Sequence, residues 1–141
     1  MTITLDKATI ECIGLFQGIT TAAVRDCILE PTRAVYVVEE GQIGSAIGRD
    51  GANIHAVRSR VGKSVKVYEY SPDPKRFIVN LLDGVEPYEI TIKNNTAYIT
   101  ISAEDKGRVV GKDGKNIKSL TKILERQHNI SSITVKTKTE I

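Results

Sequence analysis

Residues 47–54 read IGRDGANI, and residues 110–117 read VGKDGKNI. The two stretches lie 63 positions apart, and each holds a Gly-x-x-Gly loop with a cation and then an aspartate between the glycines, followed by x-Asn-Ile. About one such loop is expected by chance in a chain of this length, because glycine makes up about 7% of average sequences. Two loops in matching contexts indicate a duplicated unit built around a glycine loop.

The repeat extends on both sides of each loop. Apolar and polar residues alternate in the runs before it, and short polar segments separate the runs, which is typical of β-hairpins. The predicted strand pairs are 25–30 with 33–39 and 88–93 with 96–102. A short helix (42–48 or 104–111), the loop, a longer helix beginning at residue 52 or 115, and a last strand (64–70 or 132–138) follow in turn.

Each unit also begins with a predicted helix. The first runs over about residues 4–17 and ends at Gly18; the second has Asp73 as N-cap, Pro74 at its first position and Gly84 after its end. The apolar positions of all these helices, at helical spacing, form the predicted core. They are Ile43, Ala46, Ile47, Ile54, Val57 and Val61 in the first unit, and Phe77, Leu81, Leu82, Val109, Val110, Ile117, Leu120 and Leu124 in the second. Gly62 is the predicted stop of the longer helix in the first unit.

These elements predict an α+β protein of two domains, residues 1–71 and residues 72–141. The segment Ser71-Pro72-Asp73-Pro74 is the predicted boundary. It is short and stiffened by proline, so we expect the two domains to hold a nearly fixed orientation.

Composition excludes several classes of protein. No apolar run in the 141 residues is long enough to span a membrane, and the start, MTITLDKATIE, lacks the basic and apolar regions of a secretory signal. We therefore expect a cytoplasmic protein without membrane contact. The two cysteines, Cys12 and Cys27, form no CxxC pair and lie far from both histidines, so no metal site is predicted. We expect two buried thiols, with a Cys12–Cys27 disulfide as the alternative.

Charge is unevenly divided between the halves. Residues 1–71 hold eight basic and eight acidic side chains, which leaves twelve and nine for residues 72–141 out of totals of 20 and 17. The bias is strongest over residues 106–126, where seven lysines and arginines face only Asp113 and Glu125. A local positive field of this kind suits a polyanion, although a solvated helix face is the simpler alternative.

The loop has the chemistry of a phosphate-binding corner. The helix after it presents unpaired N–H groups and the positive end of its dipole, and glycines let a phosphate chain approach the main chain closely. Arg49 and Lys112 add positive charge. Asp50 and Asp113 oppose that charge, so we interpret them as helix caps, with Asn53 and Asn116 steadying the first turn. The alternative is that the glycines serve only tight helix packing.

A helix, IGRDGANI or VGKDGKNI, a second helix and a strand resemble the K-homology (KH) RNA-binding family, and the preceding helix and strand pair resemble its type II form. The resemblance implies a three-stranded sheet packed on helices, and a loop that clamps about four nucleotides of single-stranded RNA. It also implies a groove for bases beside the loop, formed by the flanking helices and the strand after them. That groove includes Ala46, Ile47, Ile54 and Lys66 in the first unit, and Val109, Val110, Ile117 and Lys136 in the second. The residues implied in RNA binding are Gly48, Arg49, Asp50, Gly51, Asn53, Ile54 and Lys66, and Gly111, Lys112, Asp113, Gly114, Lys115, Asn116, Ile117, Lys118 and Lys136.

Two type II units in tandem resemble the archaeal members of the NusA family of transcription factors. This resemblance implies binding of the nascent transcript, a role in elongation or termination, and RNA polymerase or other transcription factors as further partners. We expect a monomer without a cofactor. The alternatives are a protein-interaction scaffold or a ribosome-associated KH protein in which one loop is vestigial. No set of residues typical of a catalytic site is present, so no enzymatic activity is predicted.

Overall fold

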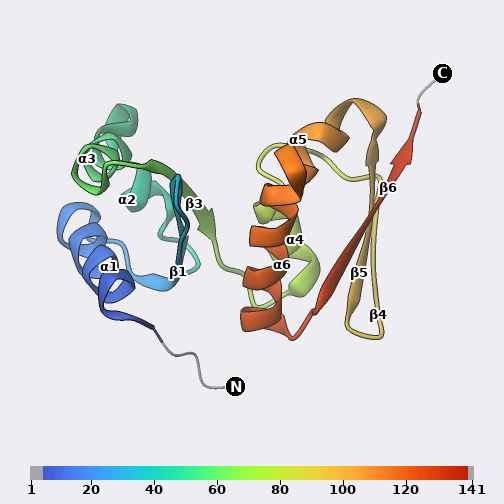
Figure 1. Ribbon diagram of the computed structural model, residues 1–141, viewed down its shortest axis with the longest axis horizontal. Coiled ribbons are helices and arrows are strands. Elements are labelled where there is room, and N and C mark those ends of the chain that lie inside the picture. The colour runs from blue at the N-terminus through green and yellow to red at the C-terminus, as the bar shows by residue number, and fades with distance from the viewer. Residues whose placement is uncertain (1–4, 140–141) are drawn as a thin grey trace. The chain divides into compact units, whose positions relative to one another are not determined.

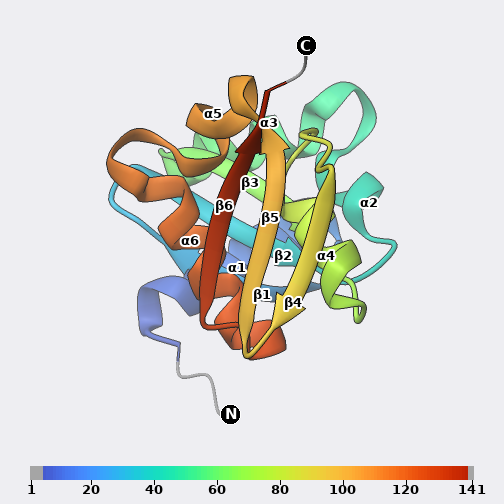
Figure 2. The ribbon, with the colours of Figure 1, turned by 90° about the vertical axis from the view of Figure 1, so that its right-hand side faces the viewer.

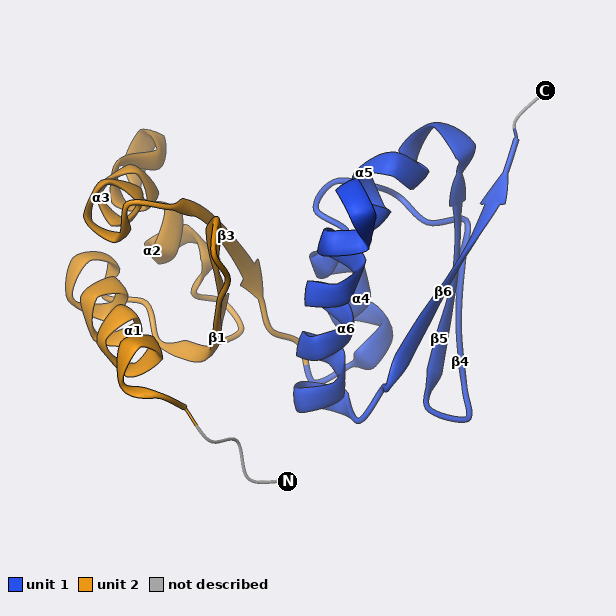
Figure 3. Ribbon diagram, viewed as in Figure 1, with its two compact units in different colours: residues 1, 72–141 blue, residues 2–71 orange. Residues whose placement is uncertain are grey.

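The computed structural model describes residues 5–139. Two compact units divide the chain, one covering residues 2–71 and the other residues 72–141 (Figure 3). The same order of elements is found in both, and each unit is described by itself below (Figure 1).

The first unit packs helices on one face of a three-stranded sheet. Its strand order is β1-β2-β3, with β1 antiparallel and β3 parallel to the central strand β2. The parallel pair requires a crossover, and the two helices that flank the first glycine loop supply it. The elements are α1 (Lys7–Thr20), β1 (Val24–Leu29), β2 (Arg33–Val38), α2 (Ile43–Ile47), a 3-10 turn (Arg49–Gly51), α3 (Ala52–Val61) and β3 (Ser64–Glu69).

The core of this unit forms where α1, α2 and α3 meet the sheet. The rings of Phe16 and Tyr36 stack with their centroids 4.2 Å apart, and Ala46 and Val57 are fully buried beside them. The Tyr36 hydroxyl donates a hydrogen bond of 3.2 Å to the carbonyl oxygen of Cys12. Burial raises the pKa of this phenol well above its ordinary value, and the nearby thiols of Cys27 and Cys12 raise it further.

Both cysteines of the first unit are free thiols. Cys27 is buried in the core described above, and Cys12 is half-buried at its edge. The disulfide that the sequence left open is therefore not formed in this structure.

The second unit repeats the arrangement. Its sheet has the order β4-β5-β6, with β4 antiparallel and β6 parallel to the central strand β5. Asn94 and Asn95 join β4 to β5 with φ of 52° and 61°, and two positive values are what the preferred two-residue hairpin turn requires. The elements are α4 (Pro74–Leu81), β4 (Glu89–Lys93), β5 (Thr96–Ser102), a 3-10 turn (Ala103–Asp105), α5 (Lys106–Val110), a second 3-10 turn (Lys112–Gly114), α6 (Lys115–His128) and β6 (Ser132–Lys138).

The two faces of the second sheet differ in character. Ala97, Ile99 and Ile101 on β5 are buried, whereas the alternate residues Tyr98 and Thr100 are partly exposed. Figure 2 shows this sheet with α4 and α6 behind it. Since side chains alternate between faces along a strand, one face of the sheet forms the core with the helices and the other is polar.

The α+β class and the predicted element order are confirmed, with differences at particular residues. Helix α1 begins after Asp6, which accepts a hydrogen bond from the Thr9 N–H, and it runs through Gly18 to Thr20. The predicted end at Gly18 was wrong because Thr21 takes the left-handed conformation that ends the helix. Ile47 was also misplaced in the core, since 42% of it is exposed.

The second leading helix and the predicted helix stop agree with the structure. Asp73 caps α4 through a 3.1 Å bond from the Lys75 N–H, and Gly62 ends α3 in the left-handed conformation. Over residues 5–139, no helix has the length and apolar character needed to cross a lipid bilayer.

Candidate nucleic-acid interface

The two glycine loops share one backbone conformation. The φ and ψ angles are 77° and 172° at Gly48, and 77° and 169° at Gly111. The aspartates two residues later have the left-handed helical conformation, with φ and ψ of 53° and 28° at Asp50 and of 56° and 24° at Asp113. Each loop therefore turns the chain sharply between two helices through the same sequence of unusual dihedral angles.

Glycine is required at the first position of each loop. The dihedral angles of Gly48 and Gly111 fall in a region that is essentially restricted to glycine. A Cβ atom at Gly48 would lie 2.6 Å from the Asn53 Cγ, and one at Gly111 would lie 2.8 Å from the Asn116 Cβ. The first turn of the second helix thus packs directly on bare main chain.

The asparagines of the motif hold the corner closed. The Asn53 Nδ2 donates a 2.8 Å hydrogen bond to the carbonyl oxygen of Ser45, and the Asn116 Nδ2 donates one of the same length to that of Val109. Both acceptors belong to the short helix before the loop, so each asparagine links the two helices. The interpretation that they steady only the first helical turn was too narrow.

The predicted capping role of the aspartates was wrong. No side chain caps α3 or α6, whose N-cap residues are Gly51 and Gly114. Asp50 and Asp113 instead occupy left-handed positions, which aspartate tolerates better than most residues because its short polar side chain can interact locally. Their role in the loop is to allow the left-handed backbone conformation of the turn.

Two main-chain N–H groups in each loop are available to a ligand. The N–H of Gly51 bonds the Gly48 carbonyl, but those of Arg49 and Asp50 have no acceptor among the described residues. Lys112 and Asp113 repeat this pattern in the second loop. Successive N–H groups in a right-handed and then a left-handed residue form a concave anion-binding nest.

Positive charge surrounds the nests unequally. The side chains of Arg49 and Lys112 are exposed, and neither lies within ion-pair distance of a carboxylate in residues 5–139. Lys115 and Lys118, both exposed, continue the second loop into α6. The matching positions of the first unit are Ala52 and His55.

Apolar side chains lie beside the loops as expected for a groove. Ile54 and Ile117 are half-buried and approach the second glycine of each loop, with their Cγ2 atoms 3.8 Å from the place of a Cβ there. Ala46 and Val109 are buried, so they support the surface without forming it. Ile47 and Val110 are accessible at the ends of α2 and α5.

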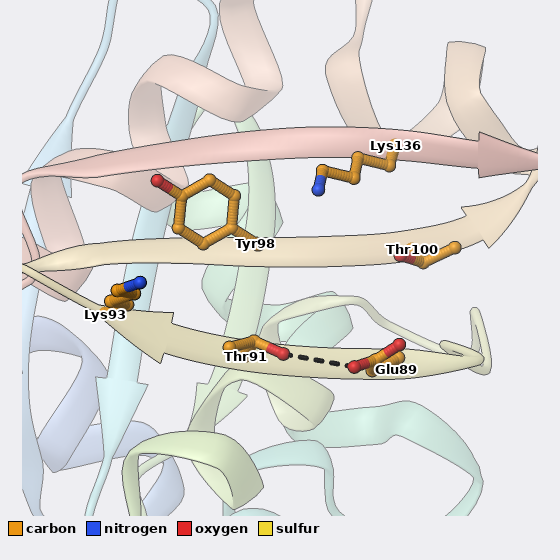
Figure 4. Close-up of a pocket in the computed structure, with 6 residues that line it drawn as sticks. All are labelled: Glu89, Thr91, Lys93, Tyr98, Thr100 and Lys136. Atoms are coloured by element: carbon orange, nitrogen blue, oxygen red, sulfur yellow. Dashed lines mark hydrogen bonds between the residues drawn. The ribbon is translucent and has the colours of Figure 1, made fainter.

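The structure places Lys66 and Lys136 away from this groove. In β3, Val65 and Val67 pack toward the helices, so Lys66 lies on the opposite face of its sheet. Lys136 pairs with Thr100 in register and lies beside Tyr98 on the polar face of the second sheet (Figure 4). The expectation that they line the groove was wrong because it ignored the two-residue alternation of these strands.

Sequence reasoning missed one pair of residues. Gly44 and Gly107 lie in α2 and α5, four residues before the first glycine of each loop. Both have helical φ values, and a Cβ atom on either would meet nothing within 4 Å. Their equal offset of 63 is the signal that could have identified them.

The described residues hold no group of three histidine, cysteine, aspartate or glutamate side chains that could bind a metal ion. His55, which follows the first loop, is exposed.

Comparison with known proteins gives consistent matches for both halves. Residues 74–138 match the family of the NusA-like second KH domain, and residues 13–81 match the KH domain family. The chain is also similar to the crystal structure of APE1850, with a TM-score of 0.78 and 32% identity over 94% of this chain and 100% of that one.

Curated relatives come from several archaea, and each has the name "Probable transcription termination protein NusA". The relative from Halobacterium salinarum is 35% identical over 136 residues, which cover 94% of this chain and 98% of the relative. The relative from Methanocaldococcus jannaschii is 34% identical, and the match covers 87% of this chain and 69% of the relative. The relative from Thermoplasma acidophilum is 30% identical, and the match covers 95% of this chain and 96% of the relative. With two type II KH folds and relatives of this identity over nearly its full length, the chain belongs to the NusA family of KH-domain proteins.

Proposed function

We propose that this protein binds single-stranded RNA with both glycine loops and acts on transcript elongation or termination, as the names of its relatives suggest. The observation that carries the proposal is the repeated nest. The two halves of the sequence, which repeat one unit, build the same corner, with the same pair of unpartnered N–H groups among the described residues and an exposed cation between the glycines. Non-glycine residues in the left-handed region, such as Asp50 and Asp113, cluster at ligand-binding sites.

The geometry favours a chain of phosphates over a single nucleotide. Each nest is open to solvent, since Arg49 and Asp50 in the first loop and Lys112 and Asp113 in the second are exposed. Ile54 and Ile117 provide an apolar surface next to the nest, where a base of the same strand can lie. About four nucleotides per loop give a footprint of roughly eight or more for the two units, residues 1–71 and 72–141.

The proposal is tested by reversing the loop charge. Arg49→Asp or Lys112→Asp places two carboxylates beside a nest, and we expect each variant to bind an unstructured oligoribonucleotide about tenfold more weakly, with a further loss in the double variant. Thermal unfolding should barely change, since both side chains are exposed and unpaired within the described chain. Arg58→Asp on α3 is a matched control for an exposed cation outside the loop.

Amide chemical shifts give an independent readout. Titration with RNA should move the N–H resonances of Arg49, Asp50, Lys112 and Asp113 before those of the sheets. Wild-type affinity in the double variant, together with unmoved loop resonances, would leave the protein-interaction scaffold as the better account.

A further inference from the structure

The polar face of the second sheet has a composition that the core and the loops do not explain. Lys93 from β4, Tyr98 and Thr100 from β5 and Lys136 from β6 surround a shallow hollow of about 260 Å³, together with Glu89 and Thr91 (Figure 4). We call these six residues, together with Tyr88 and Lys138 at the end of the same sheet, the lysine face. The hollow lies on the side of the sheet opposite the buried Ala97, Ile99 and Ile101, so it is separate from the groove beside the loop.

The lysine face combines ammonium groups with accessible aromatic rings. The Lys136 Nζ lies 5.2 Å from the centre of the Tyr98 ring, and at the end of the same sheet the Lys138 Nζ lies 5.1 Å from that of Tyr88. Lys93, Lys136 and Lys138 have no carboxylate partner among the described residues. Glu89 accepts a 3.3 Å hydrogen bond from the Thr91 hydroxyl, so three cations face one carboxylate here.

The first unit does not share this face. Val35 and Val37 stand in β2 where Tyr98 and Thr100 stand in β5, at the offset of 63 that relates the two loops. The two units thus have the same loop conformation but differ on this side of the sheet. Val35 and Val37 are buried, each 1% exposed, whereas Tyr98 is half-buried and Lys136 is exposed. Exposure accounts for polar residues on the second sheet, but it does not specify an ammonium group over a tyrosine ring, and a strand of bases and phosphates can use that pairing.

The lysine face is connected to the second loop by a short path. Lys138 pairs with Ser102 at the end of the sheet, and Ser102 is followed directly by the 3-10 turn Ala103–Asp105 and by α5, which leads into the loop. Strand β6, which carries Lys136 and Lys138, is an edge strand. The end of the sheet that carries Lys138 is thus separated along the chain from the second loop only by the 3-10 turn and α5.

We propose that the lysine face is a second contact surface for the single-stranded RNA held by the second loop. Bases stack on the rings of Tyr98 and Tyr88, and the lysines that now lie over those rings neutralise the adjacent phosphates. This inference rests on the proposed RNA binding of the loops and extends it to a longer footprint. It assigns to Lys136 a role on the sheet in place of the role in the groove.

Two lengths of RNA separate this surface from the loops. An unstructured oligouridylate of about 8 nucleotides supplies about four for each loop, and one of about 20 nucleotides has about twelve more for the sheet. In the full chain, Lys136→Gln with Lys138→Gln should weaken binding of the longer RNA about tenfold and reduce its salt slope by about 1.4, which is about 0.7 per lost phosphate contact. Binding of the shorter RNA should not change. Tyr98→Ala should also weaken only the longer RNA.

The control pair is Lys75→Gln with Arg76→Gln, two exposed residues of α4 that remove the same charge from the same unit. Two results overturn the proposal. If the control pair weakens binding of the longer RNA as much as the lysine pair does, the lysines act through general charge. If the lysine pair weakens binding of both RNAs equally, the lysines act through the groove.

Weaker binding of both RNAs by Lys112→Asp supports the loop as the anchor of the longer strand. If Lys112→Asp binds both RNAs normally, the loop proposal fails and the path from it to the sheet fails with it.

Discussion

Replacing Gly44 or Gly107 by alanine should make the protein more stable and a weaker RNA binder. Glycine in a helix is less favourable than alanine because its unfolded state has more conformational freedom. Neither glycine is needed by the fold, since both have helical dihedral angles and open space where a Cβ would lie. Ile47 follows Gly44 by three residues, so the bare main chain and the exposed side chain share one helix face beside the loop.

The two alanine substitutions should raise the free energy of unfolding and lower the RNA affinity. Each alanine should add about 0.4–1 kcal/mol to the free energy of unfolding. For a unit of this size, 1 kcal/mol raises the melting temperature by roughly 4–8 °C. A base that lies against the bare helix would be displaced by the new methyl group. Stacking and packing of one base are worth about 1–3 kcal/mol, so affinity should fall by roughly 5- to 150-fold.

Differential scanning fluorimetry and fluorescence anisotropy with a labelled oligouridylate measure the two quantities on the same samples. Gly14→Ala in α1 is the control, because Gly14 is also helical and open at its Cβ but lies far from the loop in sequence. It should raise stability equally and leave RNA affinity unchanged. If Gly44→Ala and Gly107→Ala raise stability and bind RNA as the wild type does, the reasoning that assigns these glycines to a ligand is refuted.

Four further predictions concern the loops and the core. Asp113→Asn should keep the left-handed turn, leave stability in urea unfolding unchanged and raise RNA affinity several-fold, because asparagine tolerates the same conformation and removes a carboxylate from beside the nest. Asn53→Ala should lower stability by about 0.5–1.5 kcal/mol, because the exposed hydrogen bond to the carbonyl oxygen of Ser45 is lost, and it should weaken RNA binding because the corner opens. With the first loop disabled by Arg49→Asp, the remaining RNA binding should depend on salt more steeply than with the second disabled by Lys112→Asp, since Lys115 and Lys118 accompany only the second loop. Tyr36→Phe should lower the free energy of unfolding by about 0.5–1.5 kcal/mol at pH 8, because the hydrogen bond to Cys12 is lost. The difference from the wild type should shrink above pH 10. The raised pKa of Tyr36 keeps the phenol neutral in the folded protein while it ionises in the unfolded chain, so its contribution to stability is lost as the pH rises.

The sequence predicted the architecture well because its strongest signals are local. Alternation in β4 and β5, the Asn94-Asn95 turn and the Asp73-Pro74 start of α4 each specify an element without help from distant residues. The duplication then doubled every signal, so an ambiguous segment in one half could be assigned from the other.

The errors came from features that depend on packing or on backbone angles. Gly18 looks like a helix end, but the helix continues because the positions around it, such as Phe16 and Thr20, are buried against the sheet. Asp50 has the composition of a cap, and only its φ of 53° shows that it is part of the turn. Lys66 and Lys136 were assigned to the groove by position after the helix, although the alternation of their own strands already pointed them to the other face.

The comparison of the two units separates what shapes the corner from what sets its charge. Both loops keep two glycines, an aspartate at a left-handed position and an asparagine that bonds back to the short helix, and these residues reproduce the dihedral angles closely. The cations differ: one arginine in the first loop, and Lys112 followed by Lys115 and Lys118 in the second. Geometry is therefore fixed by residues that contribute no net positive charge, and charge is adjusted by exposed residues that do not alter geometry. If the loops bind RNA as proposed, affinity can change by substitution at exposed positions while the shape that recognises a phosphate backbone stays the same.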